Sequence, residues 1–156
     1  MQPGGRPTLT QTEKQLSFRR AFEVIKEYRK REDFLAAYVV SFSVFEDRVT
    51  AAMMSALDLA GQGRPLTHTP MYKRIKVLAT EKHIDAATTA DWRSAGDERN
   101  ALIHAAMWNV DVFSAANVEL AFKRARRADA VARKLRGLVA KGGKPGMRAS
   151  ESPIET

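Results

Sequence analysis

The sequence contains no cysteine, and this absence excludes several kinds of protein at once. Without thiols there is no disulfide framework, no thiolate zinc site and no cysteine nucleophile. Long apolar runs are also missing: the longest, residues 35–45, is interrupted by two serines and is too short to span a bilayer. The first nine residues lack the hydrophobic core of a signal peptide. These absences predict a cytoplasmic protein without a membrane segment.

Acidic residues are scarce relative to basic ones, with 18 Asp and Glu against 26 Lys and Arg and a net charge of +8. This balance favours an acidic partner, with nucleic acid first in line, although a soluble basic protein without such a partner is an equal alternative. The length of 156 residues suits one domain with a single core. We predict a disordered arm over residues 1–10, a single helical domain over 11–141 and a disordered tail over 142–156, because glycine and proline gather in the arm and at the start of the tail.

Strand-like alternation, a glycine-rich phosphate loop and a metal-spaced cluster of His and carboxylates are all missing from the sequence. Apolar residues recur instead at steps of three and four, which predicts an all-α, mostly antiparallel bundle of about five helices with no metal and no cofactor. Asp85 and Ser114 are expected to cap the last two helices, and Gly61 to end the second. The predicted core stripe of the second helix comprises Leu35, Tyr38, Phe42, Phe45, Val49, Ala52 and Ala56. On the third helix, Met71, Ile75 and Leu78 are expected inside, and Lys73, Arg74, Lys76 and Lys82 outside.

The stretch 98–108 carries the most chemistry. It has no Gly or Pro and favours a helix, with Arg99 in a slot of the apolar stripe that otherwise asks for an apolar side chain. An unpaired guanidinium there would be costly, so Arg99 is expected to have an acidic partner, a bound anion or an open interface. Glu46, at the border of the second helix's stripe, is a natural partner, although a lysine or water is an equally good partner for that carboxylate. The full stripe is Trp92, Ala95, Arg99, Leu102 and Ala106.

Two further polar residues accompany Arg99. His104 lies roughly 140° further around the helix, and Asn100 stacks below His104 at a spacing of four residues. A long arginine can curl across this surface, so that the three side chains converge on one anionic group. A histidine can take the proton of a ribose 2′-hydroxyl, and a guanidinium can hold the phosphate as charge builds on its oxygens. The combination predicts RNA cleavage.

The string Arg-Asn-Ala-Leu-Ile-His at residues 99–104 resembles the signature of the HEPN superfamily, in which an arginine, commonly followed by a polar residue, precedes a histidine by four to six residues. Such proteins are small helical bundles, and many are metal-independent ribonucleases that act as toxins or in phage defence. The resemblance implies that Arg99 binds the scissile phosphate, that His104 acts as or orients the base, and that Asn100 and Glu46 orient this pair. It also implies a 2′,3′-cyclic phosphate product, a homodimer cleft, and a nucleotidyltransferase or other antitoxin as a possible partner.

Further basic residues are candidates for RNA binding. Arg124, Arg127 and Lys134 belong to the strongly basic polar surface of the last helix, and Arg64 with His68 lies in the loop 61–70. Nearby, the missing side chain of Gly96 is expected to let a helix or a substrate backbone approach Arg99. Trp108 is expected to stack on a base, or to lie in the core or an interface.

Two other functions are consistent with the sequence. The first is a non-catalytic HEPN-like module that binds a nucleotide or a partner protein. The second is a basic helical nucleic-acid-binding protein in which Arg99 and His104 are structural.

Overall fold

The computed structural model describes residues 11–142, and the predicted arm, 1–10, and the tail beyond Gly142 lie outside the described residues. The described chain forms five α-helices and no strand, which confirms the predicted all-α class. None of the helices within it is long and apolar enough to cross a bilayer. The helices are α1 (Gln11–Lys30), α2 (Phe34–Leu59), α3 (Met71–Thr80), α4 (Ala86–Ala106) and α5 (Ala115–Lys141), with a short 3₁₀ turn, η1 (Val110–Val112), before α5.

The helix ends are set by local hydrogen bonds that the sequence predicts. The carboxylate of Asp85 accepts a hydrogen bond of 2.7 Å from the backbone N–H of Thr88 and so caps α4. Ser114 and Asn117 form a reciprocal capping box at the start of α5. Gly61, just past α2, has a φ of 68°, a left-handed conformation that glycine adopts without steric cost.

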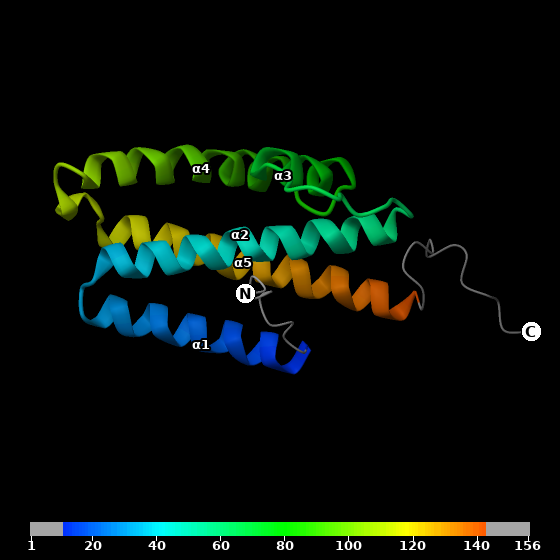
Figure 1. Cartoon of the computed structure of the whole chain (residues 1–156), viewed down its shortest axis with the longest axis horizontal. Coiled ribbons are helices and arrows are strands. Elements are labelled where there is room, and N and C mark those ends of the chain that lie inside the picture. Colours follow the sequence, from blue (N-terminus) through cyan, green and yellow to red (C-terminus); the bar gives the residue numbers. More distant parts are fainter. Residues whose placement is uncertain (1–10, 143–156) are drawn as a thin grey trace, which may run out of the picture.

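The helices form three layers, with α2 and α5 in the centre, α1 on one side and α3 with α4 on the other (Figure 1). The central pair runs parallel: the ring of Tyr38, early in α2, lies 5.2 Å from that of Phe113, just before α5, while Arg48 reaches Asp129 further along both helices. The outer helices α1 and α4 run antiparallel to this pair. The expected antiparallel arrangement therefore describes the outer helices but not the centre, because α4 carries the chain back to its starting end before α5 begins.

Aromatic and aliphatic side chains from α2 fill the core between the layers. Phe45 meets the fully buried Trp92 of α4 edge to face, with the ring centroids 5.5 Å apart. Leu35, predicted to be inside, is 38% exposed because the first turn of α2 projects past its neighbours. The other predicted core residues of α2 are all buried: Tyr38, Phe42, Phe45, Val49, Ala52 and Ala56.

Candidate functional site

Arg99, Asn100 and His104 are all exposed and lie on the last turns of α4. A single continuous helix positions them, so their relative placement follows from the helical repeat. Within residues 11–142, no hydrogen bond or ion pair restrains the side chains of Asn100 and His104, and none joins either of them to Arg99. The three polar groups are therefore available to a ligand from solvent.

The Arg99 side chain extends from α4 across the aromatic core. Its guanidinium carbon lies 4.9 Å from the centroid of the Phe42 ring, close enough for a cation–π contact. The aliphatic stem thus covers a core residue while the charged head remains in water. The sequence correctly places Arg99 on the core-facing stripe, but the side chain is not buried, and no burial penalty for its charge arises.

Glu46 does not fulfil its predicted role as the partner of Arg99. It lies half-buried on α2, one helical turn beyond Phe42, and its side chain makes no ion pair with any residue that the structure describes. The physical reason is that the Arg99 guanidinium stops over the Phe42 ring, one turn short of the carboxylate. The structure therefore contradicts the predicted Glu46–Arg99 pair.

The prediction that Arg124 belongs to an exposed RNA-binding face is wrong. Its residue is only 5% exposed, with the guanidinium 2.8 Å from Asp91 and 2.9 Å from Glu98 on α4. The hydroxyl of Tyr38 donates to the same Glu98 carboxylate, and burial together with this negative charge raises the pKa of Tyr38 to about 12. Arg124 fits inside because its neighbours on α5 are small, namely Ala121, Ala125 and Ala128. It joins α5 to α4 and is not available to a phosphate.

Arg127 and Lys134 are exposed, as predicted for the polar face of α5. Arg127 lies 3.7 Å from the Asp85 carboxylate, and Lys134 lies close enough to His83 to help burial lower the pKa of that imidazole. Both basic residues therefore face the first turn of α4. His104 is nineteen residues further along that helix, a separation of ~28 Å at ~1.5 Å per residue. Arg127 and Lys134 do not belong to the Arg99–His104 site.

The loop between α2 and α3 contains a polar cluster that the sequence shows only in part. Arg64 is exposed and pairs with Asp58 at 2.6 Å, and His68 is also exposed. Arg74, predicted to face outward, is only 8% exposed and contacts the His68 ring at 3.1 Å. The available signal was its spacing, since Arg74 precedes the buried Leu78 by four residues and so shares its face of α3.

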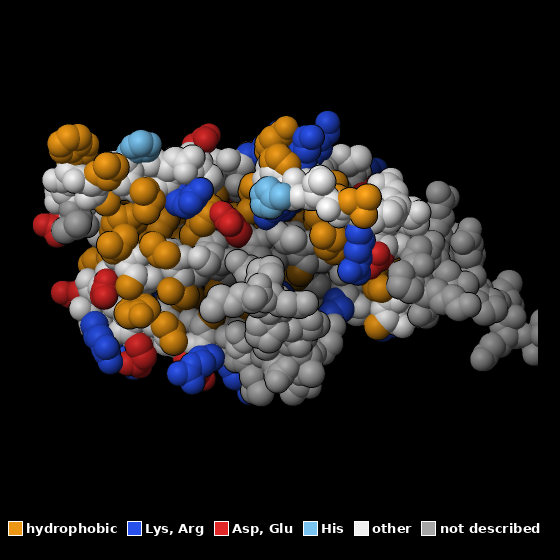
Figure 2. All heavy atoms as spheres, in the orientation of Figure 1, with side chains coloured by type: hydrophobic (Ala, Val, Ile, Leu, Met, Phe, Trp, Pro, Cys, Tyr) orange, Lys and Arg blue, Asp and Glu red, His pale blue; other side chains and the backbone are white. Residues whose placement is uncertain are grey.

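Gly96 and Trp108 lie in open surroundings. A methyl group at Gly96 would meet no atom within 4 Å, so within the monomer no neighbouring helix uses the missing side chain. Trp108 is 91% exposed, which excludes the core position that was one of its expected roles. Hydrophobic side chains gather at the left end of the face seen in Figure 2. The exposed apolar residues at the end of α4 are Ile103, Met107 and Trp108.

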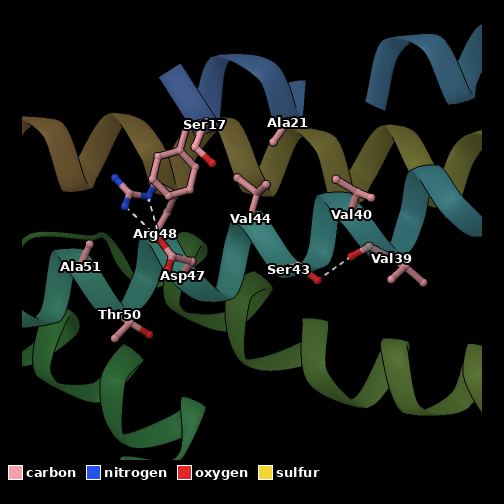
Figure 3. Close-up of a pocket in the computed structure, with 11 residues that line it drawn as sticks. Ser17, Ala21, Val39, Val40, Ser43, Val44, Asp47, Arg48, Thr50 and Ala51 are labelled. Carbon is pink, nitrogen blue, oxygen red and sulfur yellow. Dashed lines mark hydrogen bonds and ion pairs between the residues drawn. The ribbon is translucent and has the colours of Figure 1, made fainter. Parts of the chain in front are cut away.

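A groove of about 600 Å³ separates α1 from α2 (Figure 3). Its charged groups are already satisfied, because Arg48 lies 2.9 Å from Asp47 and stacks 3.7 Å above the ring of Phe18. The remaining lining is mainly small and apolar, including Val39 and Val44. The groove offers shape but no free catalytic group.

In the part of the chain that the structure describes, no group of His, Asp and Glu is arranged to hold a metal ion. Comparison of the chain with protein-family models, curated proteins and solved structures found no match. The function therefore has to be argued from the chemistry of the exposed residues.

Proposed function

We propose that this protein is an endoribonuclease that needs no metal, with its active site formed by Arg99, Asn100 and His104. One observation carries the proposal. Arg99 presents an exposed guanidinium that no carboxylate of residues 11–142 neutralises, five residues from an exposed histidine on the same helix. A guanidinium binds phosphate oxygens through paired hydrogen bonds, and an imidazole exchanges protons near neutral pH.

The reaction is an in-line transfer within the RNA. The imidazole of His104 takes the proton of a ribose 2′-hydroxyl, and the resulting oxygen attacks the adjacent phosphorus. The bond from phosphorus to the 5′-oxygen breaks, and this oxygen takes a proton from water or from the imidazolium. Arg99 stabilises the negative charge that builds on the non-bridging oxygens, while the Asn100 amide orients the ribose or the phosphate. The products are a 2′,3′-cyclic phosphate and a 5′-hydroxyl.

The spacing Arg-x4-His supports this assignment through its resemblance to the HEPN ribonucleases, from which a role as a toxin or in phage defence follows. Ile103, Met107 and Trp108 extend the proposal to assembly, because they are exposed on either side of His104. A twofold-related copy covering them would bring a second Arg99–His104 pair into the same cleft. Light scattering at micromolar concentration should give a dimer, and a monomer would contradict the shared cleft. A nucleotidyltransferase or other antitoxin is a further candidate partner.

The decisive experiment replaces His104 by alanine and follows cleavage of cellular RNA in the presence of EDTA. Because His104 is exposed and makes no side-chain bond within the described residues, the variant should fold and bind RNA as the wild type does. Loss of a general base should lower the cleavage rate by ~100- to 10,000-fold. Arg93→Ala is the matched control, since it removes an exposed arginine from the same helix outside the site. A folded His104→Ala protein that cuts RNA at the wild-type rate would overturn the proposal.

Replacement of Arg99 by alanine tests the phosphate-binding role separately. Cleavage should fall, and RNA binding should weaken as well, because the guanidinium contacts the phosphate in the ground state and the transition state. The fold should change little, since the substitution removes an exposed cation–π interaction with Phe42 that is worth roughly 0.5–1 kcal/mol. Circular dichroism and urea unfolding of both variants separate loss of chemistry from loss of structure.

A non-catalytic nucleic-acid-binding protein is the second candidate, favoured by the exposed Arg127 and Lys134 far from the site. In that case RNA stays intact with the wild type in every buffer. Binding then survives Arg99→Ala and falls when Arg127 and Lys134 become glutamine, with a salt slope lower by ~0.7 to 0.9 for each phosphate interaction that the protein no longer makes.

A further inference from the structure

Arg74 differs from the other buried arginines in having no counter-charge. Arg48 and Arg124 each lie within 4.0 Å of two carboxylates. Arg74 is buried to the same degree, at 8% exposed, but no carboxylate of residues 11–142 pairs with it. A buried cation without an anion is costly, so this site is incomplete as the isolated chain presents it.

The contacts of the Arg74 guanidinium leave part of it free. Its Nε donates to the carbonyl oxygen of Thr69 at 2.5 Å, and its Nη1 donates to the hydroxyl of Thr50 at 2.8 Å. Its Nη2 lies 3.1 Å and 3.4 Å from the two ring nitrogens of the exposed His68. These contacts use three of the ~5 N–H donors of a guanidinium and leave two for a ligand.

The start of α3 adds positive charge at the same place. The N-cap residue is Pro70, which supplies no side-chain acceptor for the first N–H groups of α3. Because Arg74 donates to Thr69, immediately before this cap, its guanidinium lies at the positive end of the helix dipole. The guanidinium and the helix start both favour an anion held between Arg74 and His68.

This cluster lies on the same face of α2 as the proposed active site. Phe42, which Arg99 covers, and Thr50, which Arg74 binds, are eight residues apart, two turns along one face of the helix. The separation along α2 is therefore ~12 Å at ~1.5 Å per residue. The half-buried carboxylate of Glu46 lies on the turn between them.

We propose that Arg74 and His68 bind a second phosphate of the RNA that Arg99 and His104 cleave, an inference that rests on the proposed function. A stacked strand rises ~3.4 Å per nucleotide, so ~12 Å corresponds to about three or four stacked nucleotides, or fewer in an extended strand. Glu46 repels phosphate but accepts hydrogen bonds from a 2′-hydroxyl or an exocyclic amine. The intervening nucleotide therefore turns its sugar or base edge toward Glu46.

Binding of 2′-deoxy oligonucleotides of two to eight nucleotides tests this subsite without any cleavage, because such strands lack the attacking hydroxyl. For the wild type, affinity should rise in a step at the length that first reaches both cations. Arg74→Gln and His68→Ala should remove that step and weaken the longer strands at least about tenfold, as for loss of a charged hydrogen bond. Lys76→Gln, which removes an exposed charge from the same helix, should retain the step. His68→Ala keeps the test valid if Arg74→Gln does not fold, because His68 is exposed.

The outcomes distinguish this inference from the proposed function. A length step that persists in folded His68→Ala and Arg74→Gln overturns the subsite, even if His104-dependent cleavage is established. Equal binding of mononucleotides and longer strands at Arg74 also overturns it, because the site would then hold a free nucleotide. A step that depends on Arg74 and His68 in a protein that cuts no RNA supports the subsite and removes the ribonuclease assignment.

Discussion

Replacing Arg124 by glutamine should destabilise the protein strongly, although its position on the basic polar side of α5 would suggest a harmless change. Three guanidinium nitrogens of Arg124 are engaged: Nε and Nη2 donate to Asp91, and Nη1 donates to Glu98. The neutral glutamine is shorter and cannot bridge both carboxylates. The variant therefore separates α5 from α4 electrostatically and leaves two negative charges close together.

The size of the loss follows from how exposed the stranded carboxylates are. Removing one partner of a fully buried ion pair costs about 3–5 kcal/mol, because the other charge remains desolvated. The Arg124 side chain is 5% exposed, but those of Glu98 and Asp91 are 24% and 41% exposed and regain some water. We therefore expect the free energy of unfolding to fall by about 2–4 kcal/mol.

Urea unfolding followed by circular dichroism measures this loss as a lower midpoint at an unchanged slope. Arg127→Gln is the matched control, since it removes an exposed arginine three residues further along α5 and should change stability by less than about 0.5 kcal/mol. The double variant with Asp91→Asn should recover part of the loss, because one stranded charge is then removed. An Arg124→Gln protein as stable as Arg127→Gln would refute the account of Arg124 as an internal link.

Three further predictions concern the same layers. Gly96→Ala should raise the free energy of unfolding by about 0.5–1 kcal/mol in denaturant titrations, because the added methyl group meets open space within a helix; a loss of stability would show that the site is not open. The raised pKa of Tyr38 means that its contribution is complete below pH ~10 and is lost as the pH rises toward about 12; the stability difference between pH 9 and 11.5 should shrink in Tyr38→Phe by about 2–3 kcal/mol, and an unchanged difference would contradict the shift. The lowered pKa of His83 means that the unfolded state takes up the proton first as the pH falls below ~6.5, so stability declines there; His83→Gln should flatten this decline, and Lys134→Gln should raise the pKa of His83 measured by NMR, because one repelling charge is removed.

Local sequence signals were sufficient for the helices and for most of the core. The caps at Asp85 and Ser114 act over three residues, and Gly61 ends α2 through its own backbone conformation, so neighbouring residues contain the needed information. The apolar stripe of α2 likewise follows from a repeat along one helix. Leu35 shows the limit, because a repeat cannot show where a helix projects beyond its neighbours.

The direction of the central helices depended on tertiary structure. Apolar stripes indicate which face of α2 and α5 is buried, but a stripe is the same whether its partner runs parallel or antiparallel. The parallel pair arises because α4 returns the chain across the bundle before α5 starts. That path determines which side chains meet, including Arg48 with Asp129.

The sequence by itself determined the spacing of Arg99, Asn100 and His104, because one helix carries all three. It also located the basic residues in the chain, but not their counter-charges. Only the tertiary structure decided that Arg124 is neutralised by Asp91 and Glu98, that Arg99 lies over Phe42 without Glu46, and that Arg74 is buried without a carboxylate. The physical reason is that an ion pair between helices depends on their relative register and separation. These are set by the packing of large and small side chains across the whole core, and a pattern within one helix contains no information about them.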